Sequence, residues 1–563
     1  MRHSSKHHSD STTIVGQALA CAKLPLRLPP GSSGASNHRR GQRPAGWAVH
    51  PSVVVRRAMD TPLKHCERPL LAGRSSEVEW GTNGQHGGSE APRKLKLALP
   101  AMCLVLLLGT FTASLHAAEP VDITWSARYV LTMDPSRRVI ENGAVAVRAD
   151  KIVAVGTRAE VDAAYKPRVR KHHPNSVLMP GLVDAHQHAP MSLLRGIAND
   201  KNLQDWLQNF IFPAEGRNVN PDFVRWGTRL ACLEMLLAGT TTYTDMYFYE
   251  DIVAEETRAA GMRGVLGETL FSFPAPDNKT EEAMLAFTEK YLQRFRGDAL
   301  ITPAVSPHAI YTVSDDLFRK SRVLANKYDA PLVFHLSETK SEFDESKAKR
   351  GGKTPVEALD ELGVFQGKTL GAHAVWLTDH DIEILARRGT GLAHCASSNM
   401  KLAAGVARVV DILKAGIPMG IGSDGFAGSN NRATLLGEVA LASKLQKVTR
   451  GDPTALPAGQ ALEMATITGA RALGMDKEIG SLEVGKRADM ITLSLDEPHA
   501  TPVYDVVSTV AYSLEASDVR DVMVNGRVVV QEREVQTIKR SEVLGKAREY
   551  RMRISESLME KGK

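Results

Sequence analysis

Apolar runs of strand length alternate with amphipathic segments through the middle of the chain, and eight such runs can be counted. Runs that are apolar throughout and separated by helical segments are typical of a parallel sheet covered on both faces. Eight strand–helix units over about 250 residues fit a (β/α)8 barrel, which we place at residues 179–483. A doubly wound open sheet is the alternative, but no Gly-rich phosphate loop follows any run. In chain order the runs are VLMPGLVDAHQH, TTYTDMYF, MRGVLGETLF, ALITPAVSPH, PLVFHLSE, TLGAHAVWL, TGLAHCASS and PMGIGSDG.

Further strand-like segments stand on both sides of this region. DITWSARYVLTM and GAVAVRADKIVAVG precede it, and ADMITLSL and VRDVMVNGRVVV follow it. We therefore predict a small β-sandwich built from both chain ends, at residues 119–178 and 484–535, with a C-terminal helix at 536–563. Within the barrel region the segments expected to be helical include 223–238, 281–295, 315–328, 355–362, 379–388 and 406–415.

Composition and charge describe a globular protein preceded by a basic extension. Hydrophobic residues make up 43% and charged residues 24% of the chain, which excludes a disordered or multi-span membrane protein. Residues 1–92 hold 12 Lys and Arg against 6 Asp and Glu, so they account for the whole net charge of +6. The remainder is neutral, and we expect no nucleic-acid partner. Because residues 1–92 lack apolar periodicity, we interpret them as a disordered or spurious extension, in preference to a His-rich metal-binding arm.

A signal-peptide pattern follows at residues 93–118. Arg93, Lys94 and Lys96 precede an uncharged apolar stretch, which ends in the small residues Ala117 and Ala118. We expect export to the periplasm or outside the cell if this segment is used, and a cytoplasmic protein otherwise. An uncleaved anchor is the rival interpretation, but Pro100 and several polar residues make a poor membrane span. We therefore expect no stable membrane insertion after cleavage.

Side chains with metal-binding or acid–base chemistry fall at the ends of six of the eight runs. Each of these residues alone is more often structural than functional. Because the carboxyl ends of barrel strands converge on one face, where active sites are built, we expect the whole set to meet there. In chain order the set is His186 and His188, Asp245, His308, His335 and Glu338, His373, and Asp424.

Four of these residues have the chemistry of a metal site. His186 and His188 have period-two spacing, so both imidazoles point to the same side of a strand. His335 adds a third nitrogen and Asp424 a carboxylate oxygen. Three nitrogens and one oxygen suit a single Zn²⁺ or Fe²⁺ with an open position for water, whose pKa the metal lowers. We expect one divalent metal per chain, with Zn²⁺ preferred.

Two further residues are candidates for the chemical step. Glu338 lies three residues after His335 and is placed to shuttle a proton from the water to a leaving group. Its alternative interpretation is a solvated loop acid, since SETKSEFDES is rich in charge. His373 is placed to polarise the atom under attack or to stabilise developing charge.

Six segments resemble the metal-dependent amidohydrolase superfamily, and within it the 5-methylthioadenosine/S-adenosylhomocysteine deaminase and s-triazine/chlorohydrolase-like group. The resemblance spans about residues 121–535. It implies a β-sandwich plus barrel, metal bound by His186, His188, His335 and Asp424, proton transfer by Glu338, and assistance from His373 and Asp424. The segments are PGLVDAHQH, HLSETKSE, GAHAVWL, HCASSNMKLAAG, GIGSDGFAGSNN and GSLEVGKRADM.

The same resemblance implies three substrate contacts. Trp206 and Glu215 match a loop pattern of the adenosine-type members, with Glu215 accepting hydrogen bonds from ribose hydroxyls and His308 touching the purine ring. Members that hold a homocysteine carboxylate use arginines after the third strand, whereas here no Arg occurs between Arg263 and Arg294, and Glu268 lies in that stretch. An anionic substrate tail therefore lacks its bidentate partner.

We accordingly predict a hydrolytic deaminase of an aminated N-heterocycle, an adenosine-type nucleoside such as 5-methylthioadenosine, that releases ammonia. Hydrolysis of a triazine substituent or of a cyclic amide is the alternative on the same fold. Binuclear amidases of the superfamily that the chain resembles usually use a carboxylated Lys at the end of the fourth strand. The fourth run here, ALITPAVSPH, has no Lys, which favours one metal and deamination. A catalytically silent exported binding protein is the alternative of a different class. We expect a homo-oligomer that acts on a small molecule.

Overall fold

The computed structural model describes residues 118–559. The predicted extension at 1–92 and the signal segment up to residue 117 lie outside the described residues. In the part that is described, no helix combines the length and apolar composition needed to cross a bilayer.

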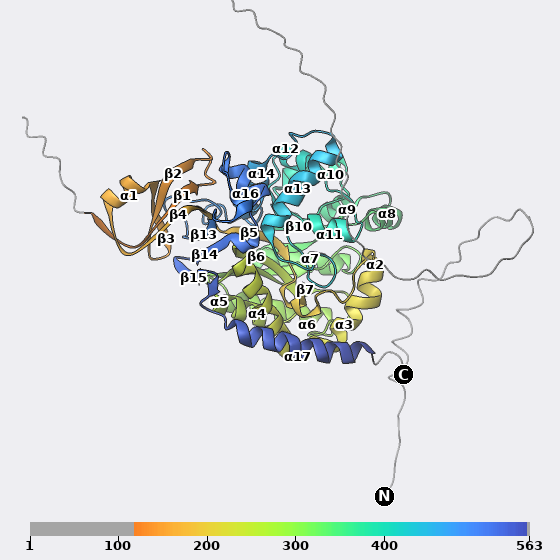
Figure 1. The fold of residues 1–563 in the computed structure, drawn as a ribbon. Coiled ribbons are helices and arrows are strands. Elements are labelled where there is room, and N and C mark those ends of the chain that lie inside the picture. The colour runs from red at the N-terminus through yellow and green to blue at the C-terminus, as the bar shows by residue number, and fades with distance from the viewer. Residues whose placement is uncertain (1–117, 560–563) are drawn as a thin grey trace, which may run out of the picture. The chain divides into compact units, whose positions relative to one another are not determined.

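Eight parallel strands close into a barrel at the centre of the fold (Figure 1). Each strand pairs with the next along the chain, and β12 closes the ring by pairing with β5 through Ile421 and Asp184. The predicted (β/α)8 barrel is therefore confirmed. Its strands are β5 (Leu182–Gln187), β6 (Thr240–Tyr247), β7 (Arg263–Leu270), β8 (Ile301–Pro307), β9 (Leu332–Leu336), β10 (Thr369–His373), β11 (Gly391–His394) and β12 (Met419–Ile421).

Helices pack around this barrel, and local caps set where several of them begin. The side chains of Thr280, Ser314 and Thr378 accept backbone N–H groups at the starts of α6, α7 and α10. These helices begin at the residues predicted from the sequence. The helices of the barrel region are α2 (Leu203–Asp205), α3 (Phe212–Asn218), α4 (Pro221–Leu237), α5 (Glu250–Ala260), α6 (Glu281–Arg294), α7 (Asp315–Lys327), α8 (Lys340–Lys349), α9 (Pro355–Glu361), α10 (Asp379–Arg388), α11 (Ala396–Lys401), α12 (Val409–Lys414), α13 (Leu435–Arg450), α14 (Ala458–Met464) and α15 (Ile467–Ala472), with a 3₁₀ turn at Ala189–Leu194 and a π-helical turn at Trp206–Ile211.

The two ends of the described chain form a second sheet, which is mixed and has eight strands in the order β16-β15-β14-β13-β4-β1-β2-β3. The sandwich predicted from both ends takes the form of this one hydrogen-bonded sheet, with Trp125 and Met490 in its core. Strand β4 is central, since it pairs in parallel with β1 and antiparallel with β13. The strands are β1 (Glu119–Leu131), β2 (Val139–Arg148), β3 (Lys151–Thr157), β4 (Tyr165–Pro180), β13 (Met490–Ser494), β14 (Val519–Val524), β15 (Arg527–Gln531) and β16 (Glu534–Val535), and the helices in these regions are α1 (Arg158–Ala164) and α16 (Val506–Tyr512).

The sheet and the barrel are joined through the chain and through a buried ion pair. Only Gly181 separates β4 from β5, and a Cβ at this position would overlap the Thr241 side chain. Arg263, at the start of β7, places its Nε 3.0 Å from a carboxylate oxygen of Asp489, and the two side chains are 3% and 2% exposed. Asp489 also accepts the Asn525 N–H at 2.6 Å.

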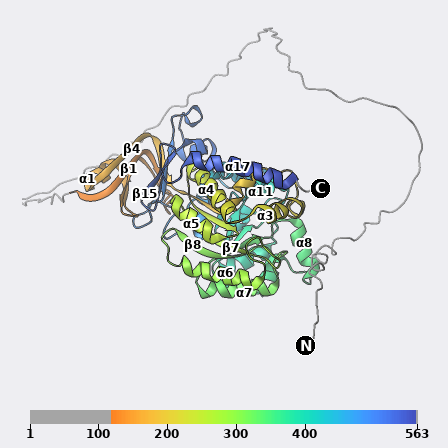
Figure 2. The same ribbon diagram turned by 90° about the horizontal axis from the view of Figure 1, so that it is seen from below.

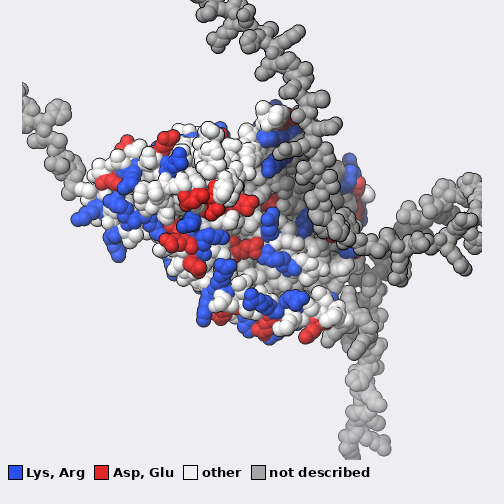
Figure 3. All heavy atoms as spheres, in the orientation of Figure 1, with Lys and Arg blue, Asp and Glu red and all other residues white. Residues whose placement is uncertain are grey.

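The last described element is α17 (Arg540–Met559), which packs along α4 and α3 (Figure 2). The Tyr550 hydroxyl donates to Asp222 at 2.7 Å, and its ring meets Phe223 edge-on. On the face seen in Figure 3, acidic and basic side chains are interspersed, in line with the neutral charge of the chain beyond residue 92.

Candidate metal centre and active site

A cavity opens at the carboxyl ends of the barrel strands. This is the barrel face predicted from the sequence. The cavity brings together eight of the residues singled out there: His188, His335, Asp424, Glu338, His373, Trp206, Glu215 and His308. His186 lies directly beneath them, with its ring centroid 4.8 Å from that of His188.

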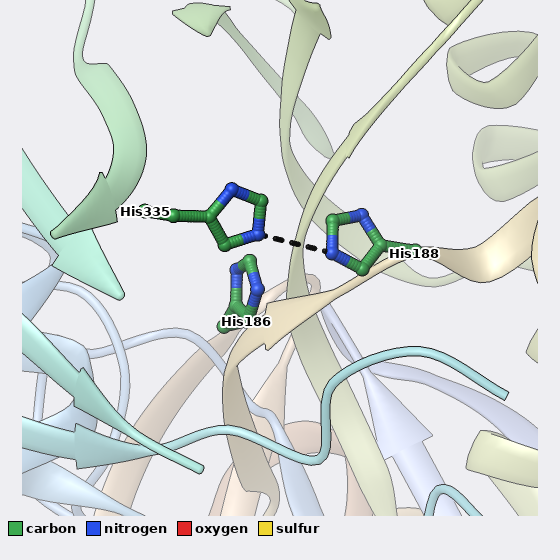
Figure 4. A group of neighbouring side chains, drawn as sticks. All are labelled: His186, His188 and His335. Carbon is green, nitrogen blue, oxygen red and sulfur yellow. Dashed lines mark hydrogen bonds between the residues drawn. The ribbon is translucent and has the colours of Figure 1, made fainter. Parts of the chain in front are cut away.

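Three imidazoles converge at the floor of the cavity: His186 on β5, His188 directly after β5, and His335 on β9 (Figure 4). The Nδ1 of His188 donates to the carbonyl of Met246 at 2.8 Å, and the Nδ1 of His335 donates to the carbonyl of His308 at 3.1 Å. Each ring therefore turns its Nε2 toward the centre, where the two Nε2 atoms lie 3.3 Å apart. Two ring nitrogens this close need a shared proton or a cation between them.

His186 gives the clearest sign of a metal site. It is fully buried, and neither of its ring nitrogens has a hydrogen-bond partner among the described residues. Burial lowers its pKa to about 4, so it is a neutral imidazole with a free lone pair. Ligand atoms of His186, His188 and His335 all lie within 4.8 Å of one another. Buried polar atoms are rarely left unsatisfied, and three nitrogens in this arrangement fit a divalent metal.

Asp424 lies next to these nitrogens, and the four side chains form a candidate donor set. Its Oδ1 lies 3.5 Å from the Nε2 of His186 and 3.3 Å from the Nε2 of His188. Although burial opposes ionisation, the adjoining rings of His186 and His188 hold the pKa of Asp424 well below its usual range. Burial likewise opposes the charged form of His188, but the Asp424 carboxylate raises the pKa of His188 to about 9. The site thus favours one positive charge beside Asp424, which a bound cation would supply.

Asp184 and Ser423 fix the place of Asp424. The Asp184 carboxylate accepts the Ser423 N–H at 2.9 Å and also accepts a hydrogen bond from the Ser423 hydroxyl. Asp424 donates its backbone N–H to the carbonyl of His186 at 2.9 Å. Asp424 has φ of +60°, a conformation that a non-glycine residue holds only when its surroundings enforce it. Burial raises the pKa of Asp184 to about 7.

Glu338 and His373 line the cavity next to the donor set. Glu338 is 2% exposed, so the solvated loop acid considered from the sequence is wrong. Burial and then the charge of Asp424 raise the pKa of Glu338 to about 8. His373 donates from Nδ1 to the amide oxygen of Asn399 at 3.0 Å, which turns its Nε2 toward Glu338 at 3.9 Å. Burial lowers the pKa of His373, so a neutral ring is favoured.

The three predicted substrate contacts all line the cavity. Glu215, on α3, is 3% exposed and accepts the hydroxyl of Tyr247 at 2.7 Å. His308 follows β8, and its ring lies 4.7 Å from that of Phe271 at an interplanar angle of 33°. Trp206 donates its indole N–H to the carbonyl of Ala427 at 2.8 Å, so it contributes a fixed apolar wall.

Comparison with known proteins assigns the family. A model of the amidohydrolase family matches residues 177–529. The chain belongs to this family. The resemblance inferred from the sequence is thereby confirmed, and divalent-metal sites are a property of the family.

Three proteins that the chain resembles carry the name of a deaminase. The chain is 43% identical over 433 residues to a 5-methylthioadenosine/S-adenosylhomocysteine deaminase from Thermodesulfovibrio yellowstonii, a match that covers 77% of this chain and 98% of that protein. It is 40% identical over 431 residues to a 5'-deoxyadenosine deaminase from Methanosarcina acetivorans, covering 76% and 97%. Among solved structures, an adenosine deaminase from Xanthomonas campestris with bound zinc aligns with a TM-score of 0.76 at 37% identity, over 78% of this chain and 99% of that one.

Some contributors to the site were not predicted from the sequence. Asp184 shares the period-two spacing of His186 and His188, so the alternation on β5 was a usable signal for it. Asn399 lies in a segment that carried the family resemblance, but nothing local indicates that it bonds His373. Asp245, which was expected among the polar strand ends, accepts the Ala189 N–H at 2.6 Å.

Proposed function

We propose that the protein is a metal-dependent hydrolytic deaminase of an adenosine-type nucleoside that releases ammonia. The single observation that carries the proposal is the buried pair of Glu338 and His373 beside the unpaired nitrogens of His186, at the floor of a cavity that also holds Glu215. This arrangement supplies a proton carrier, a donor set for a cation and a polar anchor for substrate. The deaminases that the chain resembles support the same reaction.

We assign the cation to His186, His188, His335 and Asp424, and expect one Zn²⁺ per chain, with Fe²⁺ as the alternative. Bound there, a divalent cation supplies Lewis acidity that makes water a better nucleophile near neutral pH.

Glu338 carries protons in the proposed reaction. As a carboxylate it accepts a proton from the attacking water, and as an acid it delivers a proton to the departing amino group. Its raised pKa of about 8 keeps both forms accessible near neutral pH. His373, held by Asn399 with Nε2 facing the cavity, stabilises charge that develops at the reacting carbon. Burial of both side chains strengthens these interactions by excluding bulk water.

The cavity walls suggest how a nucleoside would lie. The rings of His308 and Phe271, which are tilted by 33° to one another, offer an aromatic wall of the kind on which a purine ring packs. Glu215 presents a carboxylate with one donor, Tyr247, already in place, and its remaining lone pairs suit ribose hydroxyls.

We further propose that the substrate lacks an anionic tail. The described residues that line the cavity include no Lys or Arg, and the acids among them would repel a carboxylate. Glu268 lies in the stretch where other members carry arginines. It takes no part in binding a substrate tail, because it is fully buried and accepts the Glu250 N–H at 3.0 Å. 5-Methylthioadenosine, 5'-deoxyadenosine and adenosine therefore fit better than S-adenosylhomocysteine.

Export through the segment at 93–118 and assembly into a homo-oligomer are also part of the proposal. The first rests on the basic and apolar pattern of that segment. The second rests on the sequence interpretation alone.

An ammonia-release screen of the zinc-reconstituted protein tests the function. Adenosine, 5-methylthioadenosine, 5'-deoxyadenosine and S-adenosylhomocysteine form one arm. Free purines, pyrimidines and aminated or chlorinated triazines form the other, with chloride release measured for the chlorinated compounds. We expect release from uncharged nucleosides. Turnover of triazines alone would establish the alternative hydrolase, and binding without turnover of any compound would establish the silent binding protein.

A further inference from the structure

A second buried glutamate holds the turn that carries Glu338. Glu342 lies in the first turn of α8 and is 4% exposed. One of its carboxylate oxygens accepts the N–H of Ser337 at 3.1 Å, and the other accepts the N–H of Glu338 at 2.7 Å. Both oxygens of one side chain are therefore committed to two consecutive amides of the turn that follows β9.

This turn is strained, and it is tied to the loop after His373. Ser337 has φ of +48°, a left-handed conformation that a serine keeps only when its surroundings enforce it. The Ser337 carbonyl accepts the N–H groups of Val375 and Trp376, each at 3.0 Å. His373, two residues before Val375, has φ of +73°. The Ser337 peptide thus links the backbone of Glu338 to the backbone of His373.

The contacts of Glu342 differ from an ordinary helix cap. In α9 and α10 the third helical residue, Glu357 or Asp381, bonds the N–H of the capping threonine itself. In α8 the capping residue Thr339 accepts the Glu342 N–H at 3.2 Å, but the Glu342 carboxylate reaches past Thr339 to the two preceding amides. The Glu342 carboxylate therefore holds the backbone just before α8, from which the Glu338 side chain extends.

We propose that Glu342 is a positioning residue, which fixes the origin of the Glu338 side chain and, through Ser337, its distance from His373. This inference rests on the proposed role of Glu338 in proton transfer. Proton transfer depends steeply on geometry, and small misplacements of a reacting group reduce rates severely. Glu342 itself lines a separate hollow with Tyr311 and Arg350, so it acts through the backbone of Glu338 and does not touch substrate.

A double-mutant cycle tests this role. Glu342→Gln keeps the size of the side chain but turns an NH₂ group toward one of the two amides. We expect kcat to fall by about 10- to 100-fold, while KM and zinc content stay within about twofold of the wild type. In the Glu338→Gln background the same substitution should have no further effect, because the group that it positions has lost its function. The control is Glu345→Gln, whose side chain on the same helix is exposed and paired with Lys349.

Each result supports or overturns the inference. Glu342→Gln within twofold of wild-type kcat, or losses that multiply in the double variant as a structural defect would, overturns it. Full activity in Glu338→Gln would overturn both this inference and the proposed mechanism. If nucleosides are not turned over but another compound is, the proposed function fails and the cycle is run with that compound. Should Glu342→Gln not fold, Glu342→Asp takes its place.

Amide hydrogen exchange adds a readout that needs no substrate. We expect faster exchange at Ser337 and Glu338 in Glu342→Gln than in Glu345→Gln. Unchanged protection of these two amides would overturn the inference.

Discussion

The Nε2 of His373 lies 3.9 Å from a carboxylate oxygen of Glu338, and the two side chains are 1% and 3% exposed. His373 ends β10, and Glu338 lies just beyond the end of the neighbouring strand β9. His373 itself has a positive φ, and Glu338 directly follows Ser337, which also has a positive φ. The proposed proton carrier and the imidazole proposed to stabilise charge are thus held together away from bulk water.

Replacing Glu338 separates chemistry from binding. Glu338→Gln keeps nearly the same volume and removes no proposed metal ligand, so zinc content and affinity for a ground-state ligand should change little. Turnover should fall by about two to four orders of magnitude, the usual contribution of a positioned acid–base group. Ammonia release and metal analysis of the same preparation measure both effects. Near-native turnover would mean that proton transfer belongs to another residue.

Replacing Asp424 should act on the metal itself. Asp424→Asn removes the only proposed carboxylate ligand, so we expect metal content and activity to fall together. In the wild-type protein we expect about one equivalent of Zn²⁺ or Fe²⁺ per chain, loss of activity on chelation, and recovery with added zinc. Two tightly bound ions, or full activity without metal, would contradict a single site.

Substrate affinity should depend on pH through Glu215. Burial, partly offset by the Tyr247 hydroxyl, raises the pKa of Glu215 to about 7. The ionised carboxylate is the better acceptor for ribose hydroxyls, and it is lost as the pH falls through this pKa. KM for a nucleoside should therefore rise below about pH 7, and this dependence should be absent in Glu215→Gln. A constant KM one pH unit either side of that value would argue against the contact.

The ion pair between Arg263 and Asp489 should contribute to stability and not to turnover. Asp489→Ala leaves a buried guanidinium without its partner, which costs about 3–5 kcal/mol of unfolding free energy in comparable sites. Chemical denaturation measures the loss. Glu345→Gln, which breaks an exposed pair, should cost less than about 1 kcal/mol. Equal costs for the two variants would show that burial of the first pair has no energetic weight.

Export predicts a processed N-terminus. If the segment at 93–118 is a cleaved signal, mass spectrometry of the protein from its native host should find the mature chain beginning close to Ala118. A mature protein that begins at Met1 would contradict export through this segment.

The barrel and its polar strand ends were predictable because they depend on local patterns. A parallel strand buried on both faces reads as an apolar run, and His186, His308, His335 and His373 interrupt or end such runs. Side chains that cap helices, such as Thr280 and Ser314, fixed the helix starts for the same local reason.

Contacts between distant segments were not predictable in this way. Nothing in the sequence near Asn399 shows that it meets His373, and nothing near Ser423 shows that it meets Asp184. The first pair forms only when β10 and β11 lie side by side, and the second only when β12 closes the barrel on β5. Glu342 was visible only as an acid close to Glu338, because its reach past Thr339 depends on the positive φ of Ser337.

The central place of strand β4 has a consequence for how the chain is made. Met179 on β4 pairs with Ile491 on β13, and Asp184 on β5 pairs with Ile421 on β12. On the ribosome, β4 and β5 emerge long before their partners β13 and β12 are synthesised. Until then, one edge of each strand has unpaired N–H and C=O groups. The sheet is completed only by strands near the end of the chain, after most of the barrel has been synthesised. A nascent chain that stops before Met490 therefore keeps an open strand edge, the feature that leads partly made proteins to aggregate.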